Sequence, residues 1–175
     1  MRAVLEQAPE WRSARLIEGV FERRTELRSV GKPSQTDMMA VVSVGSDRAL
    51  LAGEGKVDEP FGERVDAWRA KGGGRPRRLA ALLATLEVAA ADVDGLRYQL
   101  LHRTCAAIYE ARGMGFDRAA MVVHSFSPSH AGFDDFSTFA AQLGVSVDTP
   151  GGISAPIRRE GVQLRLGWAA DRPHG

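Results

Sequence analysis

Residues 119–126 constrain the fold more than any other segment, because they form a largely apolar run of strand length. The run begins after Arg118 and ends before Ser127-Pro128, a pair that is typical of a turn. A strand that is apolar at successive positions is covered on both faces, as in sheets that carry helices on each side. The segment therefore predicts a buried strand inside an α/β fold.

Two further apolar runs, residues 38–44 and 49–57, flank the turn residues Gly45-Ser46 and predict a β-hairpin. A two-residue turn is the commoner geometry, and it sets Asp37 directly opposite Glu54 with both side chains on one face. A three-residue turn would instead pair Asp37 with the following glycine and separate the two carboxylates. We expect the two-residue turn and hence an adjacent pair of acids.

The remaining periodic segments predict helices and one more strand. Helices are expected over residues 9–24, 61–70, 79–91, 95–112 and 133–144, and a half-buried strand is expected over residues 162–168. Residues 71–78 contain three glycines and are expected to form a flexible loop. The order helix, hairpin, three helices, strand, helix, strand is typical of an α/β domain with a mixed β-sheet flanked by helices.

The composition excludes several classes of protein. The 175 residues carry 23 basic and 22 acidic side chains, for a net charge of +1, and one cysteine, Cys105. One cysteine rules out an internal disulfide and a multi-cysteine zinc site. No apolar stretch approaches the roughly 18 residues that a membrane span needs. Residues 1–15 are charged and lack the apolar segment of a secretory signal, so we expect a cytoplasmic protein that does not enter the membrane.

Asp37, Glu54 and Lys56 form the constellation with the clearest chemical meaning. Lys56 shares the face of Glu54, because residues two apart on a strand point the same way. Two adjacent carboxylates repel each other unless a proton or a cation lies between them. Mg²⁺ prefers oxygen ligands and binds one or two carboxylates while it keeps several waters. Beside it, the Lys56 ammonium could orient a metal-bound water or stabilise negative charge on a phosphate.

On these residues the sequence resembles the PD-(D/E)XK nuclease superfamily, in which an acid on one strand is followed by Glu/Asp-x-Lys on the next. Here the pattern is Asp37 and Glu54-Gly55-Lys56, although no proline immediately precedes Asp37. The sequence is similar to one of the uncharacterised bacterial families of that superfamily. The resemblance implies one domain over residues 1–175, with a restriction-endonuclease-like core over residues 9–145 and a C-terminal strand extension over residues 161–169.

The same resemblance implies an activity and its cofactor. It implies hydrolysis of phosphodiester bonds of DNA or RNA with Mg²⁺ or Mn²⁺. Asp37 and Glu54 would be the metal ligands, and Lys56 would be the third catalytic residue. Nucleic acid is the implied partner.

The resemblance also implies accessory residues on two helices. Superfamily members often carry a further acid on the upstream helix, for which Glu18 is the candidate, and polar residues on a later helix, here Gln99, His102 and Arg103. Gln99 and Arg103 lie at positions i and i+4 on one helix face with His102 beside them, which suits a phosphate contact. A surface salt bridge for Glu18 and a solvated helix face for the others are the simpler alternatives.

The glycine-rich segment 71–78 is a candidate contact with nucleic acid. Arginine binds phosphate with two hydrogen bonds at once, and the glycines allow wrapping; the basic residues are Lys71, Arg75, Arg77 and Arg78. A mobile solvated connector is the alternative. A net charge near zero argues against a large nucleic-acid surface. A second function therefore stays open, namely a catalytically inactive nuclease-fold module that binds nucleic acid or a protein partner. An unrelated α/β oligomerisation module is a third alternative, and a homodimer or a complex with a protein partner also stays open.

Overall fold

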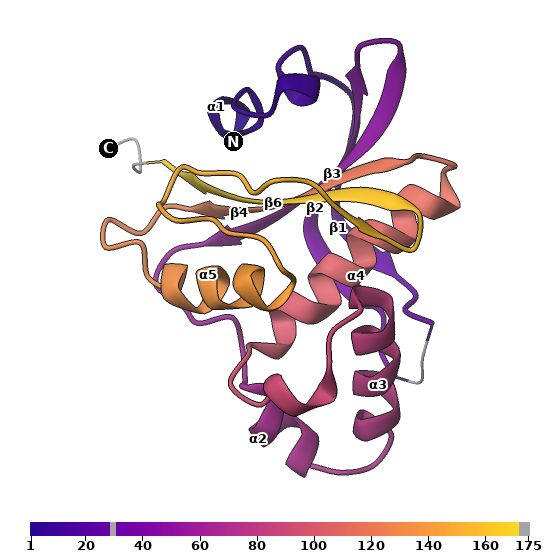
Figure 1. Ribbon diagram of the computed structural model, residues 1–175, viewed down its shortest axis with the longest axis vertical. Coiled ribbons are helices and arrows are strands. Elements are labelled where there is room, and N and C mark those ends of the chain that lie inside the picture. The colour runs from indigo at the N-terminus through magenta and orange to yellow at the C-terminus, as the bar shows by residue number, and fades with distance from the viewer. Residues whose placement is uncertain (29–30, 172–175) are drawn as a thin grey trace.

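A mixed six-stranded β-sheet forms the centre of the computed structural model, which describes residues 1–28 and 31–171 (Figure 1). The strand order is β1-β2-β3-β4-β6-β5. β2 runs antiparallel to β1 and β3, whereas β4 runs parallel to β3 and β6. The strands are β1 (Arg15–Thr25), β2 (Ser34–Val44), β3 (Asp47–Lys56), β4 (Arg118–Ser125), β5 (Ile157–Arg159) and β6 (Val162–Ala170). The predicted α/β class with a mixed sheet flanked by helices is confirmed.

Helices cover both faces of this sheet (Figure 1). α4 crosses one face with α5 beside it, α3 packs against α4, and the short N-terminal α1 lies on the opposite face. The helices are α1 (Arg2–Leu5), α2 (Val65–Ala70), α3 (Arg75–Leu86), α4 (Tyr98–Gly113) and α5 (Phe133–Gln142), with single-turn 3₁₀ helices η1 (Pro9–Trp11) and η2 (Ala90–Asp92). Within the described residues, no helix is long and apolar enough to cross a membrane.

The two-sided burial predicted for residues 119–126 is confirmed in β4. Met121 and Val123 belong to the larger hydrophobic cluster, which lies with α3, α4 and α5. Ala120 and Val122 belong to the smaller cluster, which lies with α1 and η1. β6 was expected to be half-buried, but it is buried along most of its length because it lies between β4 and β5.

The predicted hairpin is β2–β3, and its two-residue register is confirmed. Met38 lies opposite Gly53, which is the pairing that a two-residue turn produces. Side chains alternate along a strand, so Leu50 shares one face with Glu54 and Lys56. Leu50 packs in the larger cluster. The two charged residues therefore face the layer that contains α4.

The helix expected over residues 9–24 is wrong, because η1 and the edge strand β1 take its place. β1 contains a bulge between Leu16 and Glu18, and Glu22 adopts the left-handed backbone conformation with φ of +55°. These irregularities break the two-residue alternation by which a strand is recognised, and the apolar residues then recur at helical spacing. The strand leaves four large apolar side chains exposed, namely Leu16, Ile17, Val20 and Phe21.

The loop expected over residues 71–78 is a loop only at its start. α3 begins at Arg75, and Pro76 lies within its first two positions. A proline is tolerated there because its fixed φ suits the helix and no N–H is needed. The arginines of this segment are therefore on a helix. The other predicted helices begin and end within a few residues of the observed ones, and β5 was not predicted.

Candidate functional site

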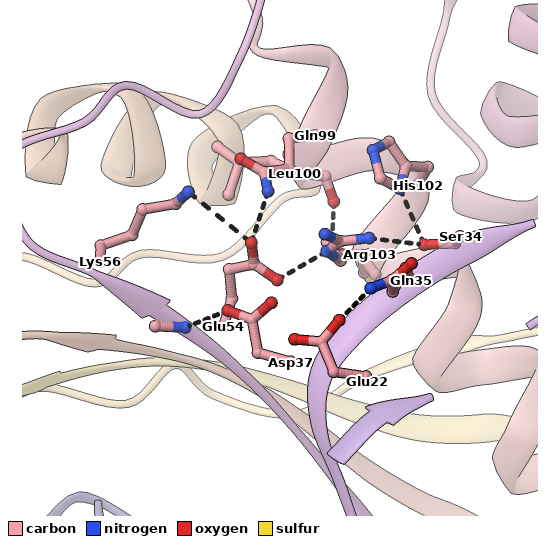
Figure 2. Close-up of polar contacts among 12 residues, drawn as sticks. Glu22, Ser34, Gln35, Asp37, Glu54, Lys56, Gln99, Leu100, His102 and Arg103 are labelled. Atoms are coloured by element: carbon pink, nitrogen blue, oxygen red, sulfur yellow. Dashed lines mark hydrogen bonds and ion pairs between the residues drawn. The ribbon is translucent and has the colours of Figure 1, made fainter. Parts of the chain in front are cut away.

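Glu54 and Lys56 lie at the end of β3, beside helix α4 (Figure 2). Both are almost fully buried, with 3% and 6% of their surface exposed. They continue the row of inward-facing side chains that includes Leu50. Buried charges are costly unless they are paired and hydrogen-bonded. The partners of this pair come mainly from α4.

Three side chains stabilise the Glu54 carboxylate, two of them by positive charge (Figure 2). Arg103 Nε donates a hydrogen bond of 2.6 Å to Oε2, and the Gln99 amide donates to Oε1. The Lys56 ammonium nitrogen is 3.7 Å from Oε1. Gln99 and Arg103 are one turn apart on α4, so a single helix face supplies both hydrogen-bond donors.

Asp37 completes the cluster from the neighbouring strand β2. Its carboxylate lies beside that of Glu54 (Figure 2), and Oδ2 accepts a hydrogen bond of 2.8 Å from the backbone N–H of Gly55. Oδ1 has no hydrogen-bond partner among the described residues. Asp37, Glu54 and Lys56 are therefore brought together, and the hairpin register is the reason.

The surroundings of Glu54 perturb its ionisation. Burial raises the pKa of Glu54 above its ordinary value, and the adjacent Asp37 carboxylate adds to the rise. Arg103 and Lys56 oppose this rise in pKa without cancelling it. Perturbed carboxylates in dry, charged surroundings concentrate at functional sites.

Lys56 is held between two acids and an aromatic ring. Its Nζ is 3.6 Å from Glu59 Oε1 and 5.3 Å from the centre of the Phe61 ring, in addition to its ion pair with Glu54. Burial opposes the ionisation of Glu59, but backbone hydrogen bonds and the Lys56 charge lower the pKa of Glu59 below its ordinary value. These contacts fix the ammonium group within reach of the carboxylate pair.

The acid that accompanies the cluster from β1 is Glu22 rather than Glu18. Glu18 is exposed and lies nearer the start of β1, opposite Val41, so the structure does not bring it to Asp37. It is on a strand and not on the predicted helix. The register between β1 and β2 leaves Glu22 opposite Asp37, and its carboxylate accepts a hydrogen bond from Gln35 (Figure 2). The strand register is the signal that would have found Glu22, and the helical interpretation concealed it.

His102 does not contact the carboxylates. Its Nδ1 is 2.8 Å from Ser34 Oγ, and the same hydroxyl accepts a hydrogen bond of 3.1 Å from Arg103. Burial lowers the pKa of His102 to about 3, and Arg103 and Arg78 act in the same direction. The imidazole is therefore neutral near pH 7. Ser34 was missed in the sequence because only the fold brings the start of β2 to α4.

The basic residues of segment 71–78 do not form one surface. Lys71 is engaged in an ion pair with Glu63. Arg77 is exposed. Arg75 and Arg78 instead line a cavity that also includes His102. The four basic residues predicted to contact nucleic acid are therefore separated, and only Arg75 and Arg78 lie together in a cavity.

Asp37 and Glu54 are the residues that could hold a divalent cation. In the part of the chain that the structure describes, no group of three or more His, Cys, Asp or Glu side chains is arranged to hold a metal ion. Two carboxylates suffice for Mg²⁺, which keeps several waters. Glu54 is less free than Asp37, because its oxygens already accept hydrogen bonds from Arg103 and Gln99. A cation bound to Glu54 would therefore compete with these donors for the carboxylate oxygens.

Comparisons with known proteins identify a family but no activity. A family model described as a domain of unknown function (DUF6946) matches residues 1–173. The comparison with curated proteins and the comparison with solved structures both give no match. No fold neighbour therefore supports a restriction-endonuclease-like core, and the chemistry of the site rests on its own geometry.

Proposed function

Because the chain belongs to the DUF6946 family, whose function is unknown, we propose from the geometry of the site that it is a metal-dependent nuclease acting on DNA or RNA. The observation that carries this proposal is the burial of Glu54 and Lys56 beside Asp37. Replacing a buried ion pair by apolar residues is often neutral or stabilising, so stability alone does not account for this cluster. A carboxylate pair that can hold a metal ion, beside a fixed cation, suits the hydrolysis of a phosphodiester, and the cluster offers both.

The residues of the cluster have separate roles in this proposal. Asp37 and Glu54 would hold Mg²⁺ or Mn²⁺, which when bound polarises a phosphoryl oxygen and makes a bound water more acidic. Lys56 places a compact ammonium group 3.7 Å from Glu54 Oε1, where it can orient the attacking water or stabilise charge on the phosphate. Gln99 orients the Glu54 carboxylate by donating to Oε1.

Arg103 changes its partner in this proposal. In the structure its guanidinium neutralises Glu54 and also donates to Ser34. Once Glu54 serves as a metal ligand, the bond to Ser34 keeps the guanidinium near the cluster. A guanidinium so placed can bind a phosphate with two parallel hydrogen bonds. Arg103 is therefore our candidate for the phosphate contact from α4.

The finer assignment of the fold is part of the same proposal. We infer a restriction-endonuclease-like core from the hairpin β2–β3, from α4 beside its end, and from β4, which pairs in parallel with β3. In this arrangement the acids at the open end of the hairpin face the donors on α4, which supports the comparison with that fold.

Cleavage assays with single-stranded, double-stranded and nicked DNA, and with RNA, test the proposal in Mg²⁺ or Mn²⁺. Glu54→Gln and Asp37→Asn should each lower cleavage by at least about 100-fold, because each removes charge from the carboxylate pair. EDTA should abolish cleavage by the unmodified protein. Cleavage that survives Glu54→Gln belongs to a contaminant, and the catalytic assignment is then wrong.

Glu110→Gln provides a matched control for these variants. Glu110 is a second buried acid, on α4 rather than β3, and it binds Arg23 and Thr25 rather than the cluster. Glu110→Gln should cleave at the rate of the unmodified protein, although it should lose about as much folding stability as Glu54→Gln. If Glu110→Gln loses as much activity as Glu54→Gln, the loss reports on folding and not on the site.

A catalytically inactive module that binds nucleic acid or a protein partner is the second candidate, and one observation favours it. Both oxygens of Glu54 already accept hydrogen bonds within the chain, so its carboxylate is neutralised without a metal. Such a module would show no rise in melting temperature with Mn²⁺ and would bind its partner equally well in EDTA. A protein partner would find exposed apolar side chains on β1, including Leu16 and Phe21.

A further inference from the structure

A cavity of about 520 Å³ lies next to the carboxylate cluster and plays no part in the proposed hydrolysis. It is formed by α2, the first turn of α3, the first turns of α4 and the segment before β2. This volume is in the range of cavities that bind small ligands. The side chains of its lining that could meet a ligand include Lys32, Trp68, Arg75, Arg78, Tyr98 and His102.

The lining of this cavity is strongly basic. Lys32, Arg75 and Arg78 contribute three positive charges, and the described residues that line it include no Asp or Glu. Arg75 donates hydrogen bonds of 3.3 and 3.2 Å to the carbonyl oxygens of Lys71 and Gly72. Carbonyl oxygens fix a guanidinium without neutralising it, so the charge of Arg75 remains available to an anion.

Aromatic rings hold the two arginines of the cavity in place. Trp68 and Tyr98 stack with their ring centres 3.7 Å apart, and the Arg75 guanidinium lies 5.8 Å from the centre of the Trp68 ring. Arg78 Nε donates a hydrogen bond of 2.6 Å to the Tyr98 hydroxyl. The cations are therefore positioned before any ligand arrives, which reduces the entropy lost on binding.

Gly31 allows Arg78 to reach the cavity. Its φ of +114° lies in the region that favours glycine, and a Cβ there would lie 2.8 Å from Arg78 Nη1. Arg78 is 7% exposed. A buried arginine in a concave basic site is a typical arrangement for recognising a phosphate group.

We propose that this cavity binds the phosphomonoester group of a nucleotide. A phosphomonoester carries about −1.5 to −2 charges near pH 7, which three cations can balance. His102, which is neutral, adds a polar ring to the wall without adding charge. The ligand is either a free mononucleotide or the phosphorylated end of a nucleic-acid strand, since both present the same group.

The strand-end form of this ligand rests on the proposed nuclease function. Hydrogen bonds connect the cavity with the cluster through His102, Ser34, Arg103 and Glu54 in turn. A strand whose terminal phosphate occupied the cavity would therefore present a nearby phosphodiester to the cluster. The protein would then act close to strand ends.

Calorimetric titration in EDTA tests the cavity without involving the metal site. Adenosine 5′-monophosphate should bind at least about tenfold more tightly than adenosine, because only the former carries the phosphomonoester. Lys32→Gln with Arg75→Gln should weaken nucleotide binding by at least about tenfold. Arg77→Gln removes one positive charge from the helical turn that holds Arg75, but outside the cavity, and should leave binding unchanged.

The position of the bound group is tested separately by tryptophan fluorescence. Trp11 and Trp168 are 1% and 0% exposed, so Trp68 is the tryptophan that a ligand in the cavity would perturb. Inorganic phosphate should change the emission of the unmodified protein but not that of Trp68→Phe. Equal binding of nucleotide and nucleoside, no binding at about 1 mM nucleotide, or an equal loss in Arg77→Gln would overturn the proposal.

Oligonucleotides distinguish the two forms of the ligand and separate this inference from the nuclease proposal. Tighter binding of a 5′-phosphorylated strand than of its 5′-hydroxyl form in EDTA supports the strand end, whereas equal binding of the two strands limits the cavity to free nucleotide. Asp37→Asn should abolish cleavage and leave nucleotide binding unchanged. Nucleotide binding by a protein that cleaves nothing would refute only the nuclease, and cleavage without nucleotide binding would refute only the cavity.

Discussion

Arg103→Met should strengthen the binding of Mn²⁺ to the protein while it weakens the metal-free fold. The substitution keeps an unbranched apolar stem but removes the guanidinium that donates to Glu54 Oε2 at 2.6 Å. A cation at Glu54 would then no longer compete with that hydrogen bond or face the guanidinium charge. The variant therefore tests whether Arg103 and a metal compete for the same carboxylate.

The sizes of both effects follow from burial and charge. The side chains of Arg103 and Glu54 are 11% and 4% exposed, so removing one partner leaves a charge with little water. Such losses cost about 3 kcal/mol at the low end of the range for buried pairs, which corresponds to a fall in melting temperature of about 6–12 °C. A hydrogen bond between charged groups contributes about 1.5–3 kcal/mol, so Mn²⁺ affinity should rise by about 10- to 150-fold.

Thermal melting with and without Mn²⁺ at fixed concentration measures both effects, since a ligand that binds only the folded state raises the melting temperature. The Mn²⁺-dependent rise should be larger in Arg103→Met than in the unmodified protein. Arg23→Met is the control, because Arg23 also binds a buried acid outside the cluster, namely Glu110 on α4, at 2.9 Å. It should lower the melting temperature without changing the response to Mn²⁺.

Two outcomes would refute this reasoning. An equal or smaller response to Mn²⁺ in Arg103→Met would show that the guanidinium does not compete with the metal. A response that persists after Asp37→Asn is added to Arg103→Met would show that Mn²⁺ binds elsewhere. In the second case the carboxylate pair is not the metal site.

Three other features are tested by stability and turnover. Burial and two nearby arginines lower the pKa of His102 to about 3, whereas the pKa of histidine in an unfolded chain is about 6.5. Between these pH values the imidazole of His102 is protonated in the unfolded chain but not in the folded one. The free energy of unfolding should therefore fall as the pH falls below about 6.5, by up to about 1.4 kcal/mol per pH unit. Urea unfolding of His102→Gln should show a shallower pH dependence, and an identical dependence would contradict the assignment. Glu110→Gln should lower the free energy of unfolding by about 2 kcal/mol, because Arg23 and Thr25 of β1 both donate to that carboxylate. An unchanged urea midpoint would show that these hydrogen bonds between β1 and α4 do not stabilise the fold. Lys56→Met should abolish cleavage but keep the Mn²⁺-dependent rise in melting temperature, since both carboxylates remain, and loss of that rise would make Lys56 a requirement for metal binding.

Local signals account for the parts of the fold that could be predicted. β4 was predictable because its apolar residues recur at successive positions. The register of β2 and β3 was predictable because a two-residue turn determines every cross-strand pair of a hairpin. That register is also why Asp37, Glu54 and Lys56 could be grouped before the structure was known.

Other elements could not be predicted because neighbouring residues do not determine them. β1 has irregularities that imitate helical spacing, and its pairing with β2 decides its conformation. The choice between Glu18 and Glu22 depends on the same pairing. Whether the fold belongs to the restriction-endonuclease-like class, and whether the protein is a nuclease, stay predictions.

The sequence by itself determined that Asp37, Glu54 and Lys56 lie together, because a hairpin brings residues close in the chain into register. Only the tertiary structure decided what surrounds them. Arg103 binds Glu54 across 49 positions of sequence, and the basic cavity combines the segment before β2 with three helices. Such contacts depend on how α4 packs on the sheet, and packing is the sum of many weak apolar contacts that no short segment encodes.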